Sequence, residues 1–473
     1  MAARHSGKST PRPPGISPGV PLALARWREQ HYRAPRYELG FRLRAGARSV
    51  AGTLRLKVTL RRGPVDLVLD WRGGPVRDVL VNGKPVVVRY KREHIVIPRR
   101  ALRRGRNILQ LAFSSPIGAG GPLRRYRDAG DGAEYLYTLL VPADASALFP
   151  CFDQPGLKGR FRLALELPAG WRAVSNTPAL EERRGLARFA ETGPISTYLF
   201  AFAAGPFRVV TRKGEPVRLF VRQSRLAGAR AVATELLRLN RTAMDRFARY
   251  CGHPFPFAKY DLVLIPDFHY GGMEHAGATF LREDRILLRR PASRDSRRRR
   301  ALLVLHETAH QWMGNLVTMR WFDDLWLKEG FANCLAYGAL QALAPEFDGE
   351  RAWADLAEAG RRAAAKPGAP ALRVPLANLA AARSVYTDVV YCTAPVLLRR
   401  AEREFGAARF RQAVRAFVRR HAWAAADWRD LVRAFERSTG RDLQAWARRR
   451  ILRPGALTAS APATRANGIQ SNP

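Results

Sequence analysis

The chain has 473 residues, of which 47% are hydrophobic and 10% aromatic, enough for roughly two to four domains with buried cores. It has no run of about 18 apolar residues, so a membrane-spanning helix is not expected. The formal charge of +41 comes mainly from arginines spread along the whole chain. This pattern disfavours a dedicated nucleic-acid site and predicts salt-sensitive, non-specific binding to polyanions.

The first segment, residues 1–30, is basic and rich in Pro, Gly and Ser, and we expect it to be a disordered leader. Its apolar run at residues 20–25 is too short for the core of a secretion signal. The cysteines are scattered without any CxxC pair, which disfavours disulfides and predicts a reducing, cytoplasmic location. They are Cys151, Cys251, Cys334 and Cys392.

Residues 31–205 have the pattern of an antiparallel β domain. Apolar and polar residues alternate in two clear stretches, which is typical of strands with one buried face. The buried positions would be Leu54, Leu56, Val58 and Leu60 in the first stretch and Phe161, Leu163 and Leu165 in the second. The pair Asn82-Gly83, which lies between apolar runs, is a strong signal for a hairpin turn.

Residues 206–281 mix helix and strand signals. A helix is expected from Val232, and the short apolar stretch at 260–266 predicts a buried strand. Gly271 and Gly272 allow tight turning and the close approach of another chain. The next stretch, residues 278–281, is predicted to be an edge strand, to which a peptide could add through main-chain hydrogen bonds.

The strongest signal is His306-Glu307-x-x-His310, followed by Glu329. Apolar residues at helical spacing surround the histidines, which would lie one turn apart on one helix face and reach the same zinc ion. Glu329 falls on a second apolar helical segment and would supply the third ligand if the two helices pack together. A fourth position stays open for water, which is typical of catalytic zinc, and Glu307 could take a proton from that water. One zinc ion per chain is therefore predicted.

A short motif of this kind also arises by chance, and the alternative is a pair of core histidines with satisfied hydrogen bonds. The acidic residue at a suitable distance, on a segment with its own helical pattern, is an independent requirement. It favours the zinc site, and we interpret residues 302–331 as the centre of the chemistry of the chain.

The remaining part of the chain is mainly helical in pattern. The alanine-rich stretch at 347–366 is predicted to be a solvated helix, and amphipathic helices follow from Phe405. Between them, Tyr386 and Tyr391 precede an apolar helical segment at residues 395–398. Residues 456–473 are small and polar and are expected to be a disordered tail.

The stretches HETAHQWMGNLVT and WFDDLWLKEGFAN resemble the signature of the aminopeptidase N family of zinc peptidases, a gluzincin group with HExxH, 18 intervening residues and Glu. The stretch FPCFDQPGLKGRFRLALELPAGWRAVSNTP is similar to part of the N-terminal domain of that family. The resemblance implies an α+β multidomain fold: an N-terminal antiparallel β domain over residues 31–205, then a thermolysin-like, mainly helical zinc peptidase domain over 206–455. The C-terminal domains usual in the family are expected to be absent, leaving a more open cleft.

The resemblance also implies roles for particular residues. Glu274, within Gly271-Gly272-Met273-Glu274-His275, would bind the free α-amino group of the substrate. Tyr391 would donate a hydrogen bond to the carbonyl oxygen of the tetrahedral intermediate, with Tyr386 beside it in the substrate site.

Three positions depart from the pattern of the family. Leu139 stands where the family has a glutamine in the first substrate pocket, which predicts an apolar or small first residue. His275 stands in place of asparagine, and Cys392-Thr393-Ala394 in place of Glu-Lys-Gly. These changes put the usual substrate contacts, the specificity and the pH profile in doubt.

The expected function is a zinc-dependent aminopeptidase that removes the N-terminal residue from peptides with a free N-terminus through a metal-activated water. Three alternatives stay open. They are a related epoxide hydrolase, a thermolysin-like endopeptidase without an amine anchor, and a catalytically drifted relative that binds peptides or proteins. Hydrolysis of N-blocked peptides would favour the endopeptidase, and activity lost to a zinc chelator would exclude the binding module.

Overall fold

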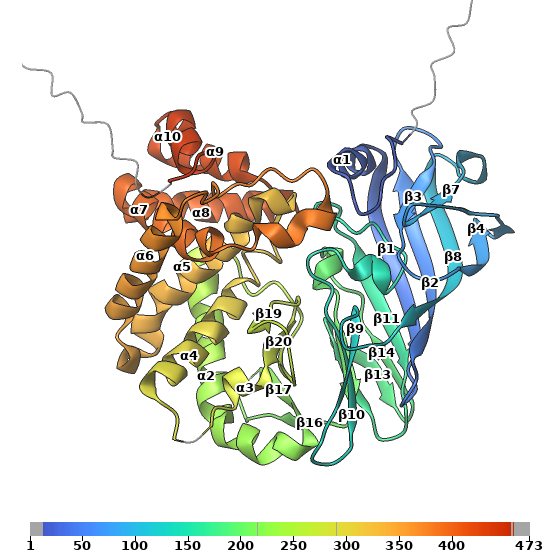
Figure 1. Cartoon of the computed structure of the whole chain (residues 1–473), viewed down its shortest axis with the longest axis horizontal. Coiled ribbons are helices and arrows are strands. Elements are labelled where there is room, and N and C mark those ends of the chain that lie inside the picture. The colour runs from blue at the N-terminus through green and yellow to red at the C-terminus, as the bar shows by residue number, and fades with distance from the viewer. Residues whose placement is uncertain (1–12, 215, 290, 456, 458–473) are drawn as a thin grey trace, which may run out of the picture.

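The computed structural model describes residues 13–214, 216–289, 291–455 and Leu457. They form two lobes side by side, a β-rich lobe from the first part of the chain and a mainly helical lobe from the second (Figure 1). The predicted tail, except Leu457, and residues 1–12 of the predicted leader lie outside the described residues. None of the helices in the described part is long and apolar enough to cross a bilayer.

The largest sheet of the first lobe has eight strands. In spatial order they are β13 (Ala179–Arg183), β14 (Leu186–Phe189), β11 (Arg160–Glu166), β1 (Tyr32–Arg42), β2 (Ser49–Leu60), β8 (Gly105–Pro116), β4 (Arg77–Val81) and β5 (Lys84–Pro85). The predicted alternation is confirmed in β2 and β11, whose apolar side chains are buried at every second position. The hairpin at Asn82-Gly83 is confirmed as well, because it joins β4 to β5 with both residues at positive φ.

One pair in this sheet differs from the prediction of an antiparallel domain. β1 and β11 run parallel, with Tyr37 opposite Phe161, while the other pairs described for this sheet are antiparallel. Alternation in a strand indicates which face is buried, but it carries no information about the direction of the neighbouring strand.

Two smaller sheets complete the β-rich lobe. One contains β12 (Arg172–Ser175), β15 (Phe202–Gly205), β10 (Glu134–Thr138) and β9 (Leu123–Arg127), and the other contains β3 (Leu67–Asp70), β7 (His94–Ile97) and β6 (Arg89–Lys91). The sheets pack around an aromatic core, in which Tyr37 and Phe161 stack with ring centres 4.7 Å apart. The core therefore lies between the sheets and leaves the loops at their ends to meet the helical lobe.

The prediction of a disordered leader is wrong for residues 22–30, because Leu22–His31 form helix α1. Leu24 and Trp27 are buried against the β-rich lobe. The Arg28 guanidinium, which is fully buried, makes two hydrogen bonds to Asp70 on β3, at 2.6 and 2.8 Å. This partner is 42 residues away in the sequence, so the local composition, rich in Pro, Gly and Ser, could not indicate that the segment is ordered.

The second lobe begins with a five-stranded sheet. Its spatial order is β16 (Phe207–Val210), β17 (Val217–Arg222), β18 (Tyr260–Ile265), β20 (Ala278–Arg282) and β19 (Gly272–Met273). The buried strand predicted at 260–266 is confirmed as β18. The predicted edge strand at 278–281 is wrong in one respect, because β20 is internal and the short β19 beside it forms the edge.

Helices make up most of the second lobe (Figure 1). They are α2 (Leu226–Cys251), α3 (Glu283–Ile286), α4 (Arg294–Ala309), α5 (Leu325–Leu343), α6 (Gly349–Ala365), α7 (Ala394–Phe405), α8 (Ala407–His421), α9 (Trp428–Thr439) and α10 (Gln444–Arg450). A short parallel pair joins β21 (Thr318–Met319) to β22 (Ala425–Ala426). Helix α6 is not fully solvated as predicted, because Ala352, Trp353 and Leu356 are buried.

The two lobes are joined by polar contacts made deep in the molecule. The Lys158 ammonium of the β-rich lobe donates to the carbonyl oxygens of Asn315 and Leu316, at 2.8 and 2.9 Å. The Arg222 guanidinium of the helical lobe contacts Asp128 of the β-rich lobe and also Glu283 at 2.6 Å. The loop that follows α4 is therefore held from the opposite lobe.

Candidate active site

Helix α4 carries the histidine pair. It begins after Ser293, whose hydroxyl accepts a hydrogen bond from the Ser296 amide at 3.1 Å, as an N-cap does. It ends at Ala309, with His310 as its C-cap. His306 and His310 are therefore one turn apart, as predicted. Beyond the helix, residues 310–317 form turns with isolated bridges at Met313 and Val317, so the apolar residues there do not continue a helical face.

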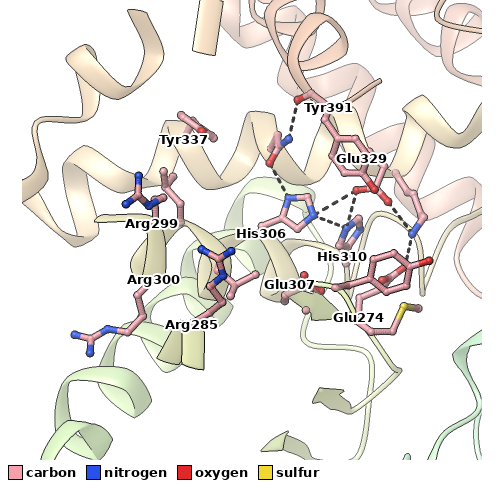
Figure 2. A pocket seen from close by; sticks show the side chains of 18 of the residues that line it. Glu274, Arg285, Arg299, Arg300, His306, Glu307, His310, Glu329, Tyr337 and Tyr391 are labelled. Atoms are coloured by element: carbon pink, nitrogen blue, oxygen red, sulfur yellow. Dashed lines mark hydrogen bonds and ion pairs between the residues drawn. The ribbon is translucent and has the colours of Figure 1, made fainter. Parts of the chain in front are cut away.

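Three side-chain atoms from α4 and the adjacent helix α5 converge (Figure 2). The Nε2 atoms of His306 and His310 are 2.9 Å apart, and each is 3.4 Å from Oε2 of Glu329. Ligands about 2.0–2.1 Å from a tetrahedral metal are separated by about 3.3 Å, so the three atoms have roughly the spacing of three of the four corners of such a site. The packing of α4 against α5 thus brings Glu329 to the histidines, as expected.

The hydrogen bonds on the far side of each ring show which nitrogen carries the proton. His310 Nδ1 lies 3.0 Å from the Met313 carbonyl oxygen, which can only accept, so Nδ1 donates. The side-chain Nδ2 of Asn333 donates to the Tyr391 carbonyl oxygen at 2.8 Å. This orientation turns Oδ1 of Asn333 toward His306 Nδ1, at 2.7 Å, so that Nδ1 donates there. With Nδ1 donating, each ring can present a lone pair at Nε2.

With both Nδ1 atoms donating, two imidazole lone pairs and a carboxylate oxygen would face one another. Such a set of acceptors repels itself unless a cation lies among them, and its N and O donors suit a divalent transition metal. Glu274, Glu307 and His310 form a second group close enough for an ion, but it contains only one of the two histidines. His306, His310 and Glu329 are therefore the group better suited to hold a metal ion.

Glu307 lies beside this position and is almost fully buried, at 5% exposure. Burial raises the pKa of its carboxyl to about 8, and its Oε2 atom has no hydrogen-bond partner among the described residues. The backbone of Gly272 comes so close that a Cβ there would be 2.4 Å from Glu307 Oε1. The carboxyl group thus has an unused oxygen and a fixed position next to the metal ligands.

Glu274 points into the same space from the loop after β19. Its Oε1 atom is 2.5 Å from Nζ of Lys328, which is also 2.9 Å from Glu329 Oε1. Burial alone would raise the pKa of Glu274, but the Lys328 ammonium outweighs it and lowers that pKa. Glu274 therefore stays ionised.

Polar residues at the end of α4 fix the loop that carries Glu274. The Asn315 amide donates to the Glu274 carbonyl at 2.6 Å, and Gln311 Oε1 accepts from the Gly277 amide at 3.1 Å. Because these residues follow directly on the histidine motif, the loop is held in register with the metal ligands.

A cavity of about 760 Å³ opens over these groups. It is lined by Gly271, by Gly272 and Met273 of β19, and by Tyr386. Figure 2 shows Tyr391 next to Glu329, with Arg285 and Arg299 on the side away from Tyr391. Tyr386 has a buried hydroxyl without a partner among the described residues. All the predicted site residues except Leu139 and His275 line the cavity or hold the metal position.

Those two residues lie behind the cavity rather than on its wall. Leu139 is 4% exposed, and Val141, two residues further along the chain, lines the cavity instead. His275 is fully buried, its ring packs against Phe280 at 4.5 Å, and burial lowers its pKa to about 3. Neither is among the residues that line this cavity, and the substrate-binding role expected for them stays a prediction.

Lys328 and Asn333 were not predicted from the sequence. Asn333 lies one turn after Glu329 on α5, and a polar residue at that spacing from a ligand is a signal that could have identified it. Lys328 gave no such signal, because a lysine on a helix is ordinarily solvent-exposed.

A β-rich lobe followed by a helical lobe with a His-Glu-x-x-His helix is the arrangement of a metallopeptidase. Residues 34–199 match the family model of the peptidase M1 N-terminal domain, and residues 236–449 match that of the peptidase family M1 domain. The two matches cover both lobes, and the chain belongs to peptidase family M1, a family of hydrolases that act on peptide bonds.

Individual relatives agree with this assignment. The chain is 31% identical to aminopeptidase N of Streptomyces lividans over 448 residues, which are 91% of this chain and 52% of the relative. It is 31% identical to aminopeptidase M1 of Arabidopsis thaliana, over 75% of this chain and 42% of the relative. It is 26% identical to leucyl aminopeptidase of Saccharolobus solfataricus, over 84% of this chain and 51% of the relative. The chain thus spans about half the length of the curated relatives it matches.

Proposed function

We propose that the protein is a zinc-dependent aminopeptidase that hydrolyses the N-terminal residue from peptides. The observation that carries this proposal is the convergence of His306 Nε2, His310 Nε2 and Glu329 Oε2 within 3.4 Å of one another, in a cavity that also contains the Glu274 carboxylate. The three atoms would hold the zinc ion, and the second carboxylate would hold the amine of the substrate.

When bound, zinc would act as a Lewis acid that makes water nucleophilic near neutral pH and polarises the scissile carbonyl. Glu307 is the general base. Its unpaired Oε2 would accept the proton of the attacking water and pass it to the leaving amine. Burial raises the pKa of Glu307 to about 8 although Lys328 opposes it, and a divalent ion beside the carboxyl group would lower that pKa, so the carboxylate would be ionised at neutral pH.

Tyr391 is proposed to stabilise the negative charge that develops on the carbonyl oxygen. Burial raises the pKa of its hydroxyl well above the ordinary value, so the group keeps its proton and can donate a hydrogen bond. One donor of this kind contributes about 3–4 kcal/mol to transition-state stabilisation in other hydrolases. Tyr386, with its unpartnered hydroxyl, is proposed to contact the substrate beside it.

Glu274 would make the enzyme an exopeptidase. A buried, ionised carboxylate close to the metal position can pair with the α-ammonium of a substrate and set its distance from the scissile bond. The edge strand β19 would meanwhile pair with the peptide backbone. An internal peptide bond offers no ammonium there, so N-blocked peptides should be poor substrates.

The test uses aminoacyl anilides, the same compounds with an acetylated N-terminus, and a zinc chelator. We expect hydrolysis of the free compounds, its loss with chelator, and its recovery with zinc. Glu307→Gln should keep the metal, measured by elemental analysis, and lose about 10²–10⁴-fold in kcat. Near-normal turnover of this variant would reject Glu307 as the base, and equal hydrolysis of acetylated compounds would reject the exopeptidase.

The cytoplasmic location and the absence of a specific nucleic-acid partner stay predictions. The cysteines are free thiols, which is compatible with a reducing compartment. Non-specific binding to polyanions would follow from the charge alone and should weaken as salt is added.

A further inference from the structure

Lys328 occupies the place where the proposed function puts the substrate amine. It precedes Glu329 on α5, and its Nζ atom lies 2.5 Å from Glu274 Oε1 and 2.9 Å from Glu329 Oε1. The side chain is 3% exposed. One cation therefore links the third metal ligand to the carboxylate proposed to hold the substrate.

The surroundings keep the lysine in this position. Its ammonium lies 5.6 Å from the ring centre of Tyr198, which comes from the β-rich lobe. The backbone of Gly314 packs along its stem, where a Cβ would be 3.4 Å from the Lys328 Cβ atom. The lysine is therefore enclosed and paired with two carboxylates.

An arriving α-ammonium would compete with this lysine. Lys328 takes one of the two Glu274 oxygens and neutralises the charge of that carboxylate. Because the lysine is part of the chain, its ammonium is present at a high effective concentration at all times. The α-ammonium of the substrate can then bind only the other oxygen of Glu274, and it gains less binding free energy because the charge of that carboxylate is already neutralised.

We propose that Lys328 is a specificity-determining residue that weakens the amine anchor, so that the preference for a free N-terminus is smaller than an unpaired Glu274 would give. The inference rests on the proposed function. A site with a neutral residue at position 328 would hold one more net negative charge and would select more strongly for a free N-terminus.

The experiment measures binding, so it does not depend on turnover. Leucine hydroxamate and 4-methylpentanohydroxamate differ only by the α-amino group, and both bind metal through the hydroxamate. Calorimetry on the zinc-loaded protein gives the ratio of their dissociation constants. We expect the ratio in favour of the amine to rise about 10-fold or more in Lys328→Met, because a competing charged hydrogen bond is removed.

Two variants serve as controls. Lys57→Met removes a lysine that pairs with Glu38 in the large sheet of the β-rich lobe, away from the cavity, and should leave the ratio unchanged. Adding Glu274→Gln to Lys328→Met should cancel the rise, because the ammonium then has no carboxylate to meet. Zinc content and thermal unfolding establish that each variant is folded and loaded.

An unchanged or smaller ratio in Lys328→Met would overturn the inference. If that variant does not fold, the unmodified protein decides. Its ratio should then be below about 10, while a ratio of about 10³ would mean a fully available carboxylate and overturn the inference. If the dissociation-constant ratios come out as expected but the protein hydrolyses no peptide, only the proposed function is rejected. If the protein hydrolyses peptides but the ratio does not change in Lys328→Met, only this inference is rejected.

Discussion

The position of the Glu307 side chain depends on Gly272, which has no side chain. A Cβ at Gly272 would be 2.4 Å from Glu307 Oε1, far inside van der Waals contact. At the neighbouring Gly271, a Cβ would be 3.4 Å from a methyl group of Leu303, an ordinary contact. Both glycines line the cavity, so the two positions form a matched pair.

We predict that Gly272→Ala lowers kcat by about 10²-fold or more, because the added methyl group pushes the base away from the attacking water. Gly271→Ala should change kcat only a few-fold. Steady-state kinetics at equal zinc occupancy make the comparison. Similar losses in the two variants would show that the loop, and not the contact with Glu307, sets the rate.

The residues of the site could be predicted to the extent that spacing along a helix determines position. His306, Glu307 and His310 follow from one helical turn, and Glu329 follows from a second helix packed on the first. Lys328 could not be predicted, because its carboxylate partner Glu274 lies on a loop 54 residues away. For Leu139 and His275, the resemblance indicated the position in the chain but not the direction of the side chain.

At the scale of elements, the loop between β10 and β11 carries a buried acid, Asp153. Its carboxyl oxygens accept hydrogen bonds from the Ser146 amide and the Thr197 hydroxyl, both at 2.8 Å. Burial nevertheless raises its pKa from 3.8 to about 6. Below pH 3.8, Asp153 is protonated in both the folded and the unfolded state, so its titration does not lower the free energy of unfolding. As the pH rises through 6, the folded state has to bury a charge.

The free energy of unfolding should therefore fall by about 3 kcal/mol between about pH 4 and about pH 7 from this residue alone. In Asp153→Asn, this part of the pH dependence should disappear, so the variant gains on the wild type as the pH rises. Urea titrations of the metal-free protein in chelator measure it. Asp78→Asn, at an exposed position of β4, should show a constant difference. A constant difference for Asp153→Asn would refute the assignment.

The elements could be predicted where a pattern is local. The strands β2 and β11, the turn at Asn82-Gly83 and the helices α4 and α5 all followed from periodicity or turn chemistry. Three features could not be predicted in this way: the parallel pairing of β1 with β11, the internal place of β20 and the buried face of α6. Each depends on which element lies beside it, and the local sequence does not indicate that neighbour.

At the scale of the whole molecule, the N-terminal segment joins the two lobes. The α1 residue Arg28 pairs with Asp70 in the β-rich lobe. Just before the helix, the Val20 carbonyl accepts from the Leu379 amide of the helical lobe at 3.0 Å, and the Leu22 amide donates to the Ala377 carbonyl at 2.8 Å. The segment expected to be a free leader is thus part of the folded structure from before α1 onward.

We predict that Arg28→Met destabilises the protein by about 3–5 kcal/mol, because it leaves Asp70 buried without its guanidinium partner. Arg26→Met, at an exposed position on the same helix, should change stability by no more than about 0.5 kcal/mol. Chemical denaturation measures both. A small effect of Arg28→Met would mean that His94, 2.8 Å from the same carboxylate, compensates for the loss.

The fastening of the loop after α4 by Lys158, together with the ring of Tyr198 beside Lys328, has a consequence for engineering. Part of the support for the cavity around Glu274 thus comes from the β-rich lobe, which contributes none of the three proposed metal ligands. A chimera that combined the β-rich half of one relative with the helical half of another would inherit mismatched supports. Its preference for the first residue of the substrate should then differ from that of both parents, so engineered exchanges should take both lobes from the same relative.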